Sequence, residues 1–122
     1  MNTNPNFKFK ELNVWQKAIE YAVAVVKTTE KLSTNRQHYK LIEQLESCCS
    51  SIAQNIAEGK GRYSKKEFQR FLFIARGSLY ESITLLELFY RMDWITIDEL
   101  NEHEKQAYEI ANMLKGLINS LK

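Results

Sequence analysis

The stretch that decides the fold is residues 50–81, SSIAQNIAEGKGRYSKKEFQRFLFIARGSLYE. It holds the end of one helical pattern, a short segment bracketed by Gly59 and Gly61, and the start of the longest helical pattern in the chain. We predict that Gly59 caps the first helix, because glycine favours the backbone conformation found just after a helix end. Ser64 and Glu67 have the spacing of a capping box, in which the serine bonds forward and the glutamate bonds back. Two long helices joined by a tight turn are therefore expected.

Elsewhere, apolar residues recur at spacings of three and four, the pattern of amphipathic helices. Asn13 is predicted to cap the first helix, and Thr96 with Glu99 forms a second capping box. The expected helices cover residues 14–31, 38–58, 65–92 and 97–121, with short turns between them, the first at Ser33–Gln37 and the last at Asp93–Ile95. The predicted fold is all-α, an up-down-up-down antiparallel four-helix bundle over residues 13–122, preceded by a flexible N-terminal arm over residues 1–12.

The third predicted helix carries more apolar residues than one buried face needs. A helix that is apolar on most sides is buried on most sides, so its second apolar surface predicts contact with another subunit. Gly77, in the middle of this helix, costs about 1 kcal/mol relative to alanine. We expect a close helix crossing to be the reason for it.

Composition indicates a single globular domain without a membrane partner. The chain has 122 residues, of which 44% are hydrophobic and 26% are charged. No secretory signal pattern and no apolar run long enough to span a bilayer is visible, so a cytoplasmic location is expected. Cys48 and Cys49 are adjacent on a helix and cannot bridge each other comfortably, which predicts buried thiols in a reducing compartment.

The sequence offers little for catalysis, a metal or a cofactor. The two histidines, His38 and His103, come with no matching nucleophile or carboxylate arrangement. The Glu-x-x-His pairs of di-metal bundles are missing, and the segment from Gly59 to Gly61 lacks the spacing of a phosphate-binding loop. We expect Glu58 to form a local ion pair with its basic neighbours and Asn55 to bond the turn backbone. The chain is therefore predicted to be non-enzymatic, with no cofactor.

The charge is distributed unevenly along the chain. Residues 60–76 contain six basic residues and one acid, a net charge of +5, although the whole chain has a net charge of only +2. Residues 81–109 contain eight acids and two bases, a net charge of −6. Basic side chains meet phosphates, and an aromatic ring among them can stack on an unpaired base. The candidate nucleic-acid-binding residues are Lys60, Arg62, Tyr63, Lys65, Lys66 and Arg70.

The alternative reading of this basic patch is a solvated helix start. Lys65 and Lys66 oppose the helix dipole at that position, which makes them locally unfavourable and tilts the interpretation towards a binding role.

Two motifs carry a resemblance to a known family. These are NIAEGxGRxSxxEFxxFLxIAxGSLxE at residues 55–81 and FxxLxVWxKA at residues 9–18. The chain from residue 9 to about residue 94 resembles the 23S rRNA-intervening sequence protein family, and the last helix matches only in pattern. The resemblance implies a left-handed antiparallel bundle, often assembled as a ring of five subunits, with no enzymatic activity. The similar accessory proteins of diversity-generating retroelements bind nucleic acid and a reverse transcriptase.

The sequence departs from the family pattern within the second helix. Gln44, Leu45, Glu46 and Ser47 stand where the family commonly has Gln-Leu-Arg-Arg, which argues against nucleic-acid binding by that face. Ala53 replaces a frequent proline, so a milder kink is expected.

Two functional hypotheses remain open from the sequence. The first is an oligomeric protein, a pentamer by resemblance, that binds RNA or DNA through the basic patch. The alternative is a protein-interaction scaffold without nucleic-acid affinity, whose basic and acidic ends meet between subunits or recruit a protein partner.

Overall fold

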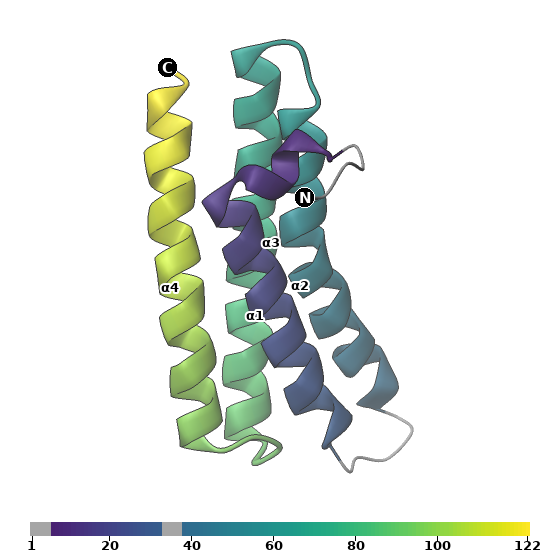
Figure 1. The fold of residues 1–122 in the computed structure, drawn as a ribbon. Helices are drawn as coiled ribbons and strands as arrows, with labels where there is room; N and C mark the ends of the chain where they lie inside the picture. Colours follow the sequence, from purple (N-terminus) through teal and green to yellow (C-terminus); the bar gives the residue numbers. More distant parts are fainter. Residues whose placement is uncertain (1–5, 33–37) are drawn as a thin grey trace, which may run out of the picture.

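The computed structural model describes residues 6–32 and 38–122. They form a short 3₁₀ helix, η1, and four long helices. Figure 1 shows the long helices side by side with alternating directions, so the predicted up-down-up-down antiparallel bundle is confirmed. The predicted turn Ser33–Gln37 and the first five residues of the predicted arm lie outside the described residues. The elements are η1 (Lys8–Glu11), α1 (Asn13–Glu30), α2 (Tyr39–Lys60), α3 (Lys65–Arg91) and α4 (Ile97–Ser120). The four long helices begin and end within two residues of expectation, whereas η1 was not predicted.

The core lies along the centre of the bundle, where the apolar stripes of the four helices meet. Each helix packs on two neighbours, and the described parts of α1 and α3 lie diagonally opposite each other. Burying these side chains removes apolar surface from water, which is the main stabilising term of the fold. The largest fully buried side chains include Tyr21 and Val25 of α1, Leu45, Ile52 and Ile56 of α2, Leu72, Leu79, Leu86 and Phe89 of α3, and Ile110 and Leu114 of α4.

The helix starts confirm the Thr96 capping box, confirm the Ser64 cap without its return bond, and correct the cap at Asn13. The hydroxyl of Thr96 accepts a hydrogen bond from the Glu99 amide, and the Thr96 amide donates to the Glu99 carboxylate, so this capping box is complete. The Ser64 hydroxyl accepts from the Glu67 amide at 3.1 Å, but the Glu67 carboxylate pairs with an arginine instead of bonding back. Asn13 was the wrong cap, because it is the first residue within α1 and Leu12 precedes it without a side-chain cap.

The end of α3 closes with a Schellman motif. Asp93 has a φ of 62°, in the left-handed region, and its amide donates to the Tyr90 carbonyl at 2.9 Å. The Trp94 amide donates to the Phe89 carbonyl at 2.9 Å, and the two rings pack with centroids 4.9 Å apart. This pattern satisfies carbonyls that the helix end would otherwise leave open, and the ring contact adds apolar packing.

Two glycines behave differently from expectation. Gly59 is buried inside α2, and the helix ends one residue later, so its predicted capping role was wrong. A Cβ at Gly59 would lie 2.8 Å from the Cβ of Phe71, which shows that glycine is needed there for close contact between α2 and α3. Gly77 is exposed, and a Cβ there would meet nothing within 4 Å. The expected close crossing at Gly77 is therefore absent from the described part of the subunit.

Cys48 and Cys49 are both buried and free. Among the described residues, none of the helices combines the length and the hydrophobicity needed to cross a bilayer.

Candidate nucleic-acid interface

The candidate interface is built on the turn between α2 and α3. Because Gly59 has no side chain, the last turn of α2 packs directly on Phe68 and Phe71 of α3. Four residues, 61–64, then connect the helices, and the last of them, Ser64, caps the start of α3 with its hydrogen bond. The close packing and the cap hold the turn at one end of the bundle, where its charged residues face solvent.

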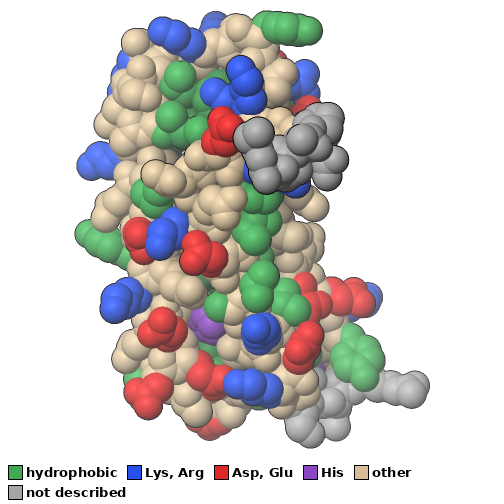
Figure 2. Space-filling view, viewed as in Figure 1, with side chains coloured by type: hydrophobic (Ala, Val, Ile, Leu, Met, Phe, Trp, Pro, Cys, Tyr) green, Lys and Arg blue, Asp and Glu red, His purple; other side chains and the backbone are tan. Residues whose placement is uncertain are grey.

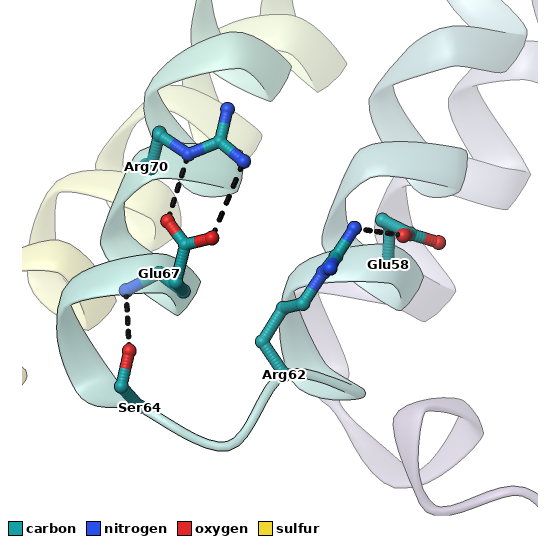
Figure 3. A network of polar contacts seen from close by, with 5 residues as sticks. All are labelled: Glu58, Arg62, Ser64, Glu67 and Arg70. Atoms are coloured by element: carbon teal, nitrogen blue, oxygen red, sulfur yellow. Dashed lines mark hydrogen bonds and ion pairs between the residues drawn. The ribbon is translucent and has the colours of Figure 1, made fainter.

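Both arginines of the predicted patch are paired with carboxylates (Figure 3). The Arg62 guanidinium bonds the carboxylate of Glu58, so the predicted local ion pair of Glu58 is confirmed. The Arg70 Nε donates to the Glu67 carboxylate at 2.8 Å. This hydrogen bond lowers the pKa of the Glu67 carboxyl and raises that of Arg70. Two of the five cations of the patch are therefore each paired with a carboxylate three or four residues earlier in the chain.

The same two arginines lie over one aromatic ring. The guanidinium carbons of Arg62 and Arg70 are 4.8 and 4.5 Å from the centroid of the Phe71 ring. A guanidinium over a ring face is attracted by the ring quadrupole. Each guanidinium is therefore held by two contacts, one with a carboxylate and one with the Phe71 ring.

The three lysines of the patch remain available to a ligand. Lys60, Lys65 and Lys66 are exposed, and within the described residues none of them forms an ion pair. The Lys60 ammonium lies 5.9 Å from the Phe68 ring centroid. With five cations against the carboxylates of Glu58 and Glu67, the patch has a formal net charge of +3. Figure 2 shows several basic side chains at this end of the visible face, whereas acidic side chains lie among basic ones towards the opposite end.

The aromatic side chain of the turn, Tyr63, is fully exposed to solvent. Its relative exposure is 108%, so no other described residue covers it. Beside it lies a hollow of about 560 Å³, lined by Phe9, Gln54, Ala57, Glu58, Gly61, Arg62 and Tyr63. Phe9 comes from η1, which crosses the bundle near this end in Figure 1. The structure thus brings the N-terminal segment next to the predicted patch.

Contacts of η1 explain why it lies there. The rings of Phe7 and Phe9 stack with centroids 5.7 Å apart, and Phe9 packs on Trp15 at 5.4 Å. The side-chain amide of Gln16 donates to the Lys10 carbonyl at 2.8 Å. Sequence reasoning did not include η1 in the site. The alternation of phenylalanine and lysine over residues 7–10 was the sequence signal that could have indicated that η1 belongs to the site.

The predicted site residues lie together, whereas other charged residues of the basic stretch lie apart from them. Residues 60–70 cover the turn and the first turns of α3. Arg76 lies further along α3, over the rings of Phe73 and Tyr80 at 5.0 and 6.0 Å.

Asn55 donates to the Ser51 carbonyl at 2.8 Å and to the Ser51 hydroxyl, so the predicted bond from Asn55 to the turn backbone was wrong.

Glu46, which stands at the first of the family's two arginine positions, has a structural contact. Its carboxylate accepts a hydrogen bond from the Thr29 hydroxyl at 2.8 Å, which ties α2 to α1. The departure from the family pattern therefore changes a helix contact as well as the surface charge.

A second notable surface follows the outer side of α3. Phe73, Ile74, Tyr80 and Leu88 are 46, 41, 53 and 38% exposed, and the bare backbone of Gly77 lies among them. Their spacing places them on one side of the helix, pointing away from the core. We call these five residues the outer α3 face. An apolar surface of this kind is typical of a protein contact site.

The two histidines lie in different surroundings. The ring of His38 packs against Trp94, with centroids 4.7 Å apart. His103 is buried, and its Nε2 lies 2.8 Å from the Thr28 hydroxyl, which also lies within hydrogen-bond distance of the Ala24 carbonyl. Burial lowers the pKa of His103 below its usual value. The Thr28–His103 contact joins α1 to α4, and the His38 ring packs at the opposite end of α2 from the basic patch.

The fold and the site define a class: a small antiparallel four-helix bundle with one basic end. The chain belongs to the 23S rRNA-intervening sequence protein family, whose model matches residues 10–116. This match confirms the resemblance seen in the central motifs and extends it through most of α4.

A solved structure supports the same assignment. It is described as a protein of unknown function from the S23 ribosomal protein family of Bacteroides thetaiotaomicron. It is 28% identical to this chain, covers 86% of this chain and 97% of its own, and superposes with a TM-score of 0.79. None of the curated proteins matches the chain.

Proposed function

We propose that the protein is a non-enzymatic, oligomeric accessory protein that binds nucleic acid through Lys60, Arg62, Tyr63, Lys65, Lys66 and Arg70. The observation that carries this proposal is the group of three unpaired lysines beside a fully exposed tyrosine at one end of the bundle. When an unpaired surface cation contacts a phosphate, it releases the counterions held there, and this release supplies a large share of the affinity for nucleic acid. Two lysines at a helix start are locally unfavourable, so a ligand is a physical reason for having them there.

Assembly strengthens the proposal. The outer α3 face offers apolar area to a second subunit, and family resemblance points to a ring of five. Repeating the basic patch in each subunit raises the effective concentration of binding sites along one strand. Free buried thiols suit a reducing compartment, so we place this activity in the cytoplasm.

The test of binding compares labelled RNA and DNA at about 50 and 200 mM salt, a range over which phosphate contacts lose orders of magnitude in affinity. We expect affinity to fall steeply with salt. The variant with Lys60, Arg62, Lys65 and Lys66 changed to glutamate should lose binding. In a matched control, four exposed lysines outside the patch are changed to glutamate, which alters the net charge by the same amount. These are Lys27, Lys31, Lys40 and Lys105. Equal binding by both variants would refute the assignment.

The test of assembly uses two tyrosines of similar exposure. Tyr80 on the outer α3 face is 53% exposed, and Tyr39 on α2 is 55% exposed. We expect Tyr80→Glu to lower the mass measured by light scattering and Tyr39→Glu to leave it unchanged. A constant mass in both variants would remove the outer α3 face from the proposal.

A second candidate function is a protein-interaction scaffold. The observation that favours it is the neutralisation of Arg62 and Arg70 by Glu58 and Glu67, which leaves the patch less basic than its sequence indicates. In this case the acidic end of one subunit or a protein partner would meet the lysines. Such a scaffold would dissociate at high salt and show no nucleic-acid affinity even at about 50 mM salt.

A further inference from the structure

We propose that the hollow between η1 and the α2–α3 turn receives one unpaired base, so that the interface prefers single-stranded nucleic acid to a duplex. This inference rests on the proposed nucleic-acid function and specifies the form of the ligand. The hollow is lined by Phe9 of η1, by Gln54 and Glu58 of α2, and by Arg62 and Tyr63 of the turn. Its volume of about 560 Å³ lies within the range of clefts that hold small organic ligands.

Aromatic side chains at this place have open faces. Tyr63 is 108% exposed and borders the hollow, and Phe7, which stacks on the lining residue Phe9, is 70% exposed. Phe7 is supported from below by the row of rings formed by Phe9 and Trp15. Exposed rings on a rigid support are the platforms on which bases of a single strand stack.

The charges determine which part of the ligand enters the hollow. Glu58 lines it in an ion pair with Arg62, so the pair has no net charge to attract a phosphate, while the carboxylate can also accept hydrogen bonds from the amino group of a base. The Gln54 side chain is exposed beside it and offers both a donor and an acceptor to a base edge. The phosphates would instead meet cations outside the hollow. Those available are Lys60, Lys65 and Lys66 of the patch and the exposed Lys8 and Lys10 of η1.

For a duplex, placing a base in the hollow costs more free energy than for a single strand. Its bases are already stacked and paired, and taking one base step apart costs a few kcal/mol. A duplex would therefore contact only the lysines, whereas a single strand would contact the lysines and the hollow together. The expected consequence is a preference that depends on Tyr63 and not on the charge of the patch.

The experiment measures polarisation of a labelled single-stranded oligonucleotide and of a hairpin duplex of the same composition, as RNA and as DNA, at about 50 and 200 mM salt. Replacing a stacking ring with alanine is expected to weaken single-strand binding about five- to hundredfold. We expect Tyr63→Ala to do so while the duplex affinity and the salt dependence stay unchanged. Tyr63→Phe keeps the ring and should keep the affinity. Tyr108→Ala, at a 71% exposed tyrosine of α4, is the matched control.

The outcomes separate this inference from the function it rests on. If charge reversal of the patch abolishes binding while Tyr63→Ala does not, and single strands bind no better than duplexes, the hollow is not a base site although nucleic-acid binding stands. If neither form binds at low salt, both proposals are wrong. The Tyr63 side chain is 108% exposed, so replacing it removes no buried surface and should leave the fold unchanged, which circular dichroism verifies.

Discussion

Gly59→Ala is expected to destabilise the protein, although alanine is a better helix former than glycine by about 1 kcal/mol. A Cβ at Gly59 would lie 2.8 Å from the Phe71 Cβ and 3.3 Å from the Phe68 carbonyl oxygen. Neither atom is the free end of a flexible side chain, so α3 itself would have to move away from α2. Overpacking of this kind costs about 1–3 kcal/mol. Because both atoms are rigidly held, we expect the upper part of this range, about 2–3 kcal/mol. After the gain of about 1 kcal/mol in helix propensity, the net loss should be about 1–2 kcal/mol, or roughly 3–10 °C in Tm for a chain of this length.

The assay is urea unfolding followed by helical circular dichroism, at one protomer concentration because assembly changes apparent stability. Gly116→Ala is the control, because a Cβ at this position in α4 meets nothing within 4 Å. It should raise the unfolding free energy by up to about 1 kcal/mol. The reasoning would be refuted if Gly59→Ala were as stable as the natural protein, or gained as much as Gly116→Ala.

Two further predictions concern His103 and Asp93. Burial lowers the pKa of His103 below 6.5 in the folded state, so its contribution to stability is present above pH 6.5 and is lost as the pH falls towards the folded pKa. The urea concentration at the unfolding midpoint should therefore fall between about pH 8 and pH 5 in the natural protein, and should fall less in His103→Gln. Asp93 has a left-handed backbone with φ of 62°, so Asp93→Gly should raise stability by about 1 kcal/mol, and an unchanged thermal midpoint would contradict this.

The helices could be predicted because their signals are local. Apolar residues at spacings of three and four mark the face that each helix buries, and a cap such as Thr96 with Glu99 acts within one helix turn. The predicted patch residues also lie together, because residues 60–70 are neighbours along the chain.

The local signals failed where two options competed. Glu67 could bond back to Ser64 or pair with Arg70, and the structure has the ion pair. Gly59 could end α2 or let α3 approach, and the bulk of Phe68 and Phe71 explains why it does the latter. In both cases the deciding atom belongs to a later turn or a different helix, whose position a residue pattern does not specify.

By itself, the amino-acid sequence determined the four helices, their antiparallel order, the family and the clustering of basic residues, because each depends on spacing over a few turns. Only the tertiary structure decided the rest. It placed Phe9 of η1 beside Tyr63 and Gln54, joined Thr28 to His103 across the bundle, and left the outer α3 face uncovered in the subunit. These features depend on how helices far apart in the chain pack against each other, and packing is set by the shapes of side chains from several helices at once.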